Sequence, residues 1–145
     1  MTANPSTSPP GKASTPVAMP AGRLVGATVL AGALAGLAAW GLCLAVRPGS
    51  APGAPWGALA GTLGTLAGVL VIQPWKARPV VAWGMTLLAS QGVSFFGVIL
   101  FGVGLYSASR PDPVGLLVGA VAAFVCALLA QATVAGARMK AAIAG

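Results

Sequence analysis

The stretch from residue 80 to residue 107 contains 28 consecutive residues without a charged side chain. A helix of ~20 apolar residues crosses the ~30 Å hydrocarbon core of a bilayer, because each residue adds ~1.5 Å to its length. Three further uncharged runs lie at residues 24–46, 56–73 and 114–137, and turns rich in Pro separate them. The four runs therefore predict four transmembrane helices.

The composition favours the same class of protein. Of the 145 residues, 57% are hydrophobic and only 6% are charged, whereas a soluble domain carries about 25% charged residues. The sequence therefore predicts an all-α membrane protein, with residues 23–140 forming one up-down bundle of four helices. Residues 1–22 are rich in Pro, Ser, Thr and Ala and have no apolar periodicity, so we expect them to form a disordered tail.

The residue types that are missing exclude much chemistry. The chain has no His and no Glu, and its only acidic residue is Asp112. General acid–base catalysis usually relies on His, Glu or Asp, and metal and haem sites draw on His, Cys clusters or carboxylates. We therefore expect no enzymatic activity and no catalytic, cofactor-binding or metal-binding residues. The two cysteines, Cys43 and Cys126, are predicted to lie too far apart for a disulfide, which requires Cα atoms within ~7 Å.

Glycines spaced four residues apart occur in the first, second and fourth runs. Such pairs place small residues on one helix face and allow another backbone to approach closely. The predicted helix-packing residues are Gly32, Gly36, Gly57, Gly61, Gly64, Gly68, Gly115 and Gly119. The second run carries four of them, and each glycine disfavours an isolated helix by ~1 kcal/mol relative to alanine. We therefore expect the second helix at the centre of the bundle, where neighbours support it.

The third run contains a group of polar side chains. Thr86, Ser90 and Ser94 recur every four residues, which puts them on one helix face with Gln91 beside them. They are candidates for a polar track or a contact with another subunit. The alternative is that they form hydrogen bonds between helices of the bundle, worth ~0.6 kcal/mol each on average.

Basic residues are distributed unequally between the two sides of the predicted bundle. The tails and the second loop hold Lys12, Arg23, Lys76, Arg78, Arg138 and Lys140, whereas the first and third loops hold Arg47 and Arg110. The positive-inside rule therefore predicts that both termini face the cytoplasm, in a bacterial-type inner membrane. The same rule explains the net charge of +7 without nucleic acid as a partner. The basic side is expected to attract anionic membrane lipids.

The second half of the chain resembles the ATP synthase protein I family. The similarity lies in the loop residues 75–78 (WKAR), the polar residues 90–92 followed by Phe95 and Phe96, a short outer turn containing Pro, and Gly115 to Gly119. Members of that family often carry charged residues in the third span, where this chain has Gln91 and Ser94. The resemblance implies a four-helix membrane protein associated with assembly of the rotor ring of F-type ATP synthases.

These observations favour a non-enzymatic accessory or assembly protein that packs against other membrane helices. Its expected partners are membrane lipids and either a second membrane protein or further copies of the same chain. The alternative is a small oligomeric transporter or channel subunit. Four-span multidrug exporters characteristically carry a membrane-embedded Glu, which this chain lacks.

Overall fold

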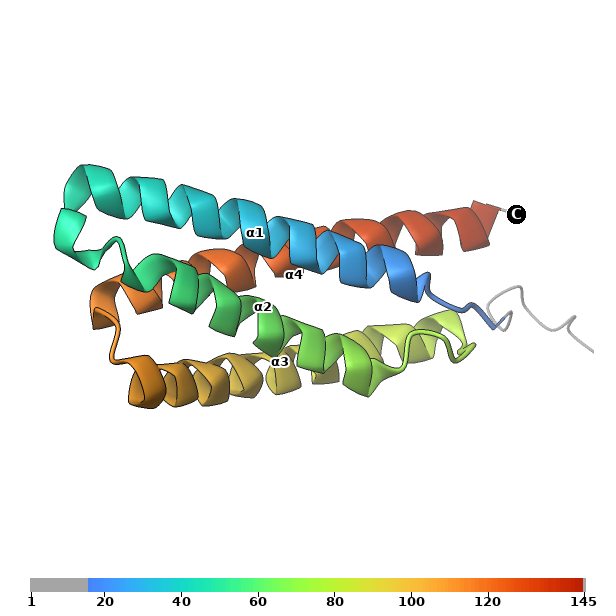
Figure 1. The fold of residues 1–145 in the computed structure, drawn as a ribbon. Coiled ribbons are helices and arrows are strands. Elements are labelled where there is room, and N and C mark those ends of the chain that lie inside the picture. Colours follow the sequence, from blue (N-terminus) through green and yellow to red (C-terminus); the bar gives the residue numbers. More distant parts are fainter. Residues whose placement is uncertain (1–15, 145) are drawn as a thin grey trace, which may run out of the picture.

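The computed structural model describes residues 16–144 and contains four long helices (Figure 1). They are α1 (Ala21–Val46), α2 (Gly53–Ile72), α3 (Val80–Ser109) and α4 (Pro113–Ala144), with a short 3-10 helix, η2 (Pro48–Ser50), between the first two. All four are long and apolar enough to cross a membrane. The predicted all-α membrane fold is therefore confirmed, with α2 starting three residues before the expected Trp56 and α4 continuing beyond Ala137.

The helix ends follow from local backbone chemistry. Both α2 and α3 end at a residue in the left-handed conformation, Gln73 with φ 48° and Arg110 with φ 44°, and a proline follows each. Proline cannot continue a helix, and it biases the residue before it away from the helical conformation. At the start of α4, Pro113 occupies the first helical position, where a missing N–H costs little.

The helices alternate in direction. The α1–α2 and α3–α4 connections therefore lie at one end of the bundle, and the two chain ends lie at the other (Figure 1). Helix α2 packs against each of the other three, and α1 also packs along α4. Helix α3 packs almost entirely on α2 and has only a small contact with α4. The bundle therefore consists of α1, α2 and α4 as a close group, with α3 attached on its outer side.

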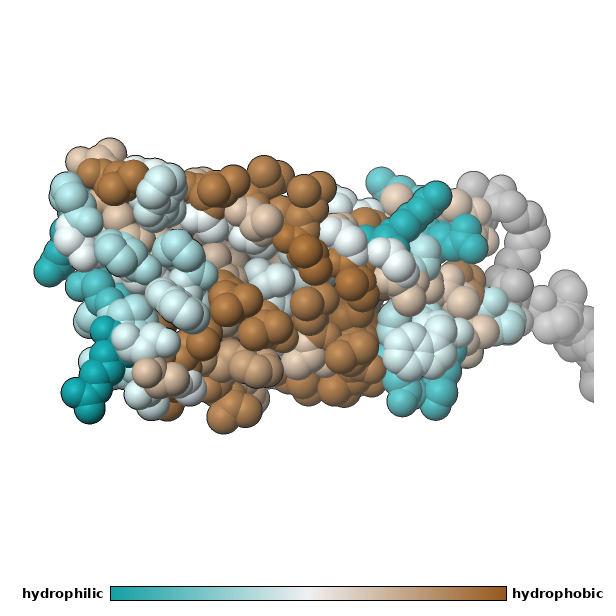
Figure 2. Space-filling view, viewed as in Figure 1, coloured by the Kyte–Doolittle hydropathy of each residue, from teal (hydrophilic) through white to brown (hydrophobic). Residues whose placement is uncertain are grey.

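Small side chains form most of the interior. In the middle of the bundle the buried hydrophobic cluster consists of Ala35, Ala58 and Ala123. Bulkier buried residues gather at the end near the chain termini: Met19, Leu24, Val69, Ile72 and Trp83. The larger apolar side chains elsewhere point outward, and Figure 2 shows them as a hydrophobic band between two more hydrophilic ends. Such a surface fits a hydrocarbon environment.

The segment before α1 differs from the expected disordered tail. Residues 1–15 lie outside the described part of the chain, but residues 16–22 are ordered. Val17 pairs with Arg78 of the α2–α3 loop through two backbone hydrogen bonds of 2.9 and 3.1 Å, and Met19 N–H donates to Pro74 O at 2.9 Å. Met19 is buried among the apolar residues named above. The structure thus has backbone pairing and a buried side chain within residues 16–22, and α1 begins at Ala21, one residue before the predicted end of the tail.

Candidate functional site

The contact between α2 and α4 is backbone on backbone. A Cβ atom added at Gly57 would overlap the carbonyl oxygen of Leu116, and one at Gly119 would overlap that of Ala54. A Cβ at Gly61 would lie 2.7 Å from Ala120 O. Three glycines on two helices thus leave no room for any side chain, which holds these helices at the closest approach that a peptide backbone allows.

The remaining predicted packing glycines also lie at helix contacts. Gly64 and Gly68 face α3, where an added Cβ would overlap the backbone of Val98 and the side chain of Ser94 respectively. Gly32 and Gly36 of α1 lie against Thr62 and Ala58 of α2. Gly115, near the start of α4, lies against Ser50 of η2. Several glycines outside the predicted set have open space at the Cβ position: Gly22, Gly26, Gly41, Gly84, Gly92 and Gly104.

Three of the four candidate polar residues of α3 make contacts within the bundle. Ser90 and Ser94 are only 3% and 2% exposed, and both lie against Gly68 of α2. Ser90 Oγ donates to Leu87 O at 2.7 Å within the helix. Thr86 Oγ1 donates to Ala82 O at 2.8 Å and accepts a 2.9 Å bond from Arg78 Nη1. Thr86 is therefore held by Arg78 of the α2–α3 loop, and the two serines allow α2 and α3 to approach closely.

Gln91 is in a different situation. Its Oε1 atom is buried, yet it has no hydrogen-bond partner among residues 16–144. The residues one turn away show which way this side of α3 faces. Leu87 packs on the cluster around Trp83, and the Phe95 ring lies 6.3 Å from the Phe124 ring of α4 in an edge-on arrangement. Gln91 thus lies on the face of α3 turned towards α4, where the two helices have little contact.

A second glutamine, Gln131, makes a side-chain hydrogen bond within the bundle. Gln131 of α4 is buried, and its Nε2 donates to Thr28 Oγ1 of α1 at 3.0 Å. Thr28 Oγ1 in turn donates to Leu24 O at 2.8 Å. This bond joins α1 to α4 and gives Gln131 a structural role.

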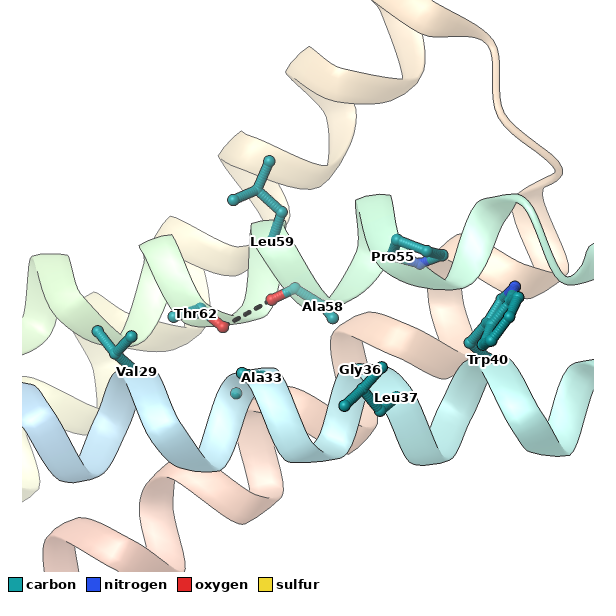
Figure 3. A pocket seen from close by; sticks show the side chains of 10 residues that line it. Val29, Ala33, Gly36, Leu37, Trp40, Pro55, Ala58, Leu59 and Thr62 are labelled. Atoms are coloured by element: carbon teal, nitrogen blue, oxygen red, sulfur yellow. Dashed lines mark hydrogen bonds between the residues drawn. The ribbon is translucent and has the colours of Figure 1, made fainter.

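A cavity of about 510 Å³ opens between α1 and α2 (Figure 3). Its walls are apolar or small side chains from both helices, with Trp40 at one end. The single hydroxyl in the lining, Thr62 Oγ1, already donates to Ala58 O at 2.7 Å. No lining residue can ionise. This cavity can accommodate an apolar group, but it offers no group for acid–base chemistry or metal binding.

The titratable groups are dispersed. The described residues contain no group of three or more His, Cys, Asp or Glu side chains that could hold a metal ion. Cys43 and Cys126 are both free, one buried and the other exposed. Asp112 caps α4, because its Oδ2 accepts a 2.9 Å hydrogen bond from Gly115 N–H. That bond is the main reason why the pKa of Asp112 is lowered, and the neighbouring Ser50 hydroxyl and Arg47 lower it further.

Within residues 16–144 the buried Ser50 hydroxyl makes no hydrogen bond of good geometry, so the Gly115 N–H is the dominant influence on the pKa of Asp112.

Comparison with known proteins adds no assignment. No protein-family model, curated protein or solved structure matches this chain. The site that stands out from the fold itself is Gln91 of α3, on the side where α3 and α4 have little contact.

Proposed function

We propose that this chain is a non-enzymatic accessory or assembly protein of the membrane, which packs through α3 against helices of a larger membrane complex. One observation carries the proposal. Helix α3 lies outside the close group of α1, α2 and α4, and its Gln91 carries a buried oxygen without a hydrogen-bond partner in the described residues.

The remaining surface of α3 suits another helix or lipid. Large apolar side chains project from it, namely Met85, Leu88, Phe95, Phe96, Ile99 and Leu100. Lipid alone would satisfy these side chains. It would not satisfy Gln91, because an amide in a hydrocarbon environment is costly without a partner. The Gln91 side chain as a whole is half-buried, so rotation of its terminal amide can bring the oxygen from its buried position to a donor on a neighbouring helix. The amide thus adds a polar anchor to an apolar interface.

The partner that we propose first is the membrane sector of an F-type ATP synthase. The support is the resemblance of the chain from the basic loop at residue 75 onward to the ATP synthase protein I family, whose members often carry charged residues in the third span where this chain has Gln91 and Ser94. The geometry supports docking on a helical surface in general, and the resemblance selects this complex for testing.

We further propose that the protein lies in the inner (plasma) membrane with both termini in the cytoplasm. The support is the excess of basic residues on the side that carries the termini and the α2–α3 loop. A reporter that is active only in the periplasm should be silent when fused after Gly145 and active when inserted near Pro52. The opposite pattern would refute this orientation.

Co-purification tests the function. The tagged chain, extracted in a mild detergent, should retain subunits of the ATP synthase membrane sector, and Gln91→Leu should remain folded but lose them. Leu34→Ala on α1, which removes an exposed leucine from a helix that packs on α2 and α4, is the control and should retain them. Flux of ions or small molecules through liposomes that contain only this chain would favour the channel alternative instead.

A further inference from the structure

A second cavity lies where α1 begins and α4 ends. Its volume is about 380 Å³, and its lining contains two basic residues, Arg23 of α1 and Arg138 of α4. The rest of the lining comes from the same two helices and the residue before α1: Pro20, Thr133, Val134, Ala137 and Ala141. Both arginine side chains are exposed, so they can reach a molecule that enters from the membrane or the solvent.

The two arginines have no acidic side chain with which to pair. The only acidic residue of the chain is Asp112, which caps the start of α4 at the opposite end of the bundle. Thr133 Oγ1 donates to Ala130 O at 2.8 Å and is therefore already engaged. Two like charges at one cavity repel each other. An anion bound between them would replace this repulsion with attraction to both arginines.

The position of the cavity identifies the anion that is most abundant there. Residues 24–46 and 114–137 carry no charge, so the hydrocarbon region ends close to Arg23 on α1 and to Arg138 on α4. This is the level of the lipid phosphates. A guanidinium group binds phosphate oxygens through two parallel hydrogen bonds. Below the two arginines, Val134 and Ala137 provide an apolar wall for the first part of an acyl chain.

We propose that this cavity binds the headgroup of an anionic phospholipid, with Arg23 and Arg138 holding its phosphate. The inference is independent of the proposed partner, because it rests on α1 and α4 and not on the outer face of α3. It assigns a single bound lipid to one place on the bundle, in contrast to the diffuse attraction that all basic residues at this end exert on the membrane.

Native mass spectrometry of the purified full chain in detergent, titrated with phosphatidylglycerol, tests the proposal. The variant Arg23→Gln/Arg138→Gln should bind at least roughly tenfold more weakly than the unaltered chain, because both guanidinium groups lose their hydrogen bonds to the phosphate. The control is Lys76→Gln/Lys140→Gln, which removes the same net charge from the same end, although neither lysine lines the cavity. The control should bind as the unaltered chain does.

A third variant, Arg23→Lys/Arg138→Lys, keeps the charge but loses the paired hydrogen bonds, and it should bind with intermediate affinity. It also keeps the test decisive if Arg23→Gln/Arg138→Gln does not fold. If Lys76→Gln/Lys140→Gln weakened binding as much as Arg23→Gln/Arg138→Gln, the proposal would be overturned in favour of diffuse attraction. Binding of phosphatidylcholine as tightly as phosphatidylglycerol would overturn the preference for an anionic headgroup. Equally tight binding of glycerol 3-phosphate would show a site for free phosphate esters instead of lipid.

Discussion

The indole Nε1 of Trp83 donates a 2.7 Å hydrogen bond to the carbonyl oxygen of Val17, which lies 66 residues earlier in the chain. The Trp83 side chain is fully buried, and the Arg78 guanidinium lies over its ring, 5.6 Å from the centroid. Because Arg78 also pairs with the Val17 backbone, these three residues fasten the segment before α1 to the start of α3. These contacts join the chain at the end of the bundle where the termini lie.

Replacement of Trp83 tests how this segment is held. Trp83→Phe keeps an aromatic ring in the core but removes the indole N–H, so residues 16–20 should detach while the helices remain. We expect a loss of about 1 kcal/mol in the free energy of unfolding. Hydrogen exchange should show faster exchange at Val17 and Met19. Trp75→Phe, at an exposed indole, should leave exchange unchanged, and equal effects of both variants would contradict the role of Trp83.

A single methyl group should distinguish the packing glycines from the others. Gly57→Ala forces a Cβ into the Leu116 carbonyl, and we expect a loss of about 1–3 kcal/mol or more in the free energy of unfolding. Gly92→Ala meets open space and should be neutral or stabilising by up to ~1 kcal/mol, because alanine favours a helix. The melting temperature in detergent measures both. Equal tolerance at the two positions would mean that α2 and α4 are farther apart than described.

Replacement by leucine should have opposite effects at Gln131 and at Gln91. Gln131→Leu removes the hydrogen bond to Thr28 and should lower the free energy of unfolding by about 0.6–1.7 kcal/mol, the range of such bonds in membrane helices. Gln91→Leu removes a carbonyl oxygen that has no partner in the described residues. It should leave the stability of the isolated chain unchanged or higher. A marked destabilisation by Gln91→Leu would show that its amide is satisfied within the bundle.

Stability should depend on pH through one side chain. Asp112 has its pKa lowered below the ordinary value of 3.8, chiefly by the Gly115 N–H. Folding therefore favours the ionised carboxylate, and its contribution is complete above that value and is lost as the pH falls through the lowered pKa. No side chain of this chain has an ordinary pKa between about 5 and 7. The melting temperature should be constant over that interval and fall in stronger acid, and Asp112→Asn should reduce the fall.

The four helices and their packing faces could be predicted because both depend on local patterns. An uncharged run has to be helical inside a membrane, where a backbone without internal hydrogen bonds is costly. Glycines four residues apart lie on one face of any helix, whatever its neighbours are. This is why Gly57 and Gly61, chosen from spacing alone, lie on the surface of α2 that meets α4.

What spacing cannot determine is which helix a face meets, since this depends on how all four helices rotate and pack together. Ser90 and Ser94 form a polar row in the sequence, but only the fold turns that row towards α2 and leaves Gln91 at the open side, where α3 barely meets α4. The ordered Val17 segment was missed because its backbone pairs with a loop about sixty residues away. The meeting of Arg23 with Arg138 likewise requires α1 and α4 to run side by side. Hydrophobicity and glycine spacing are properties of a single segment, so the amino-acid pattern alone predicts the spans and their close-packing faces. The helix that each face packs against, by contrast, is determined by contacts between distant segments, which exist only in the packed tertiary structure.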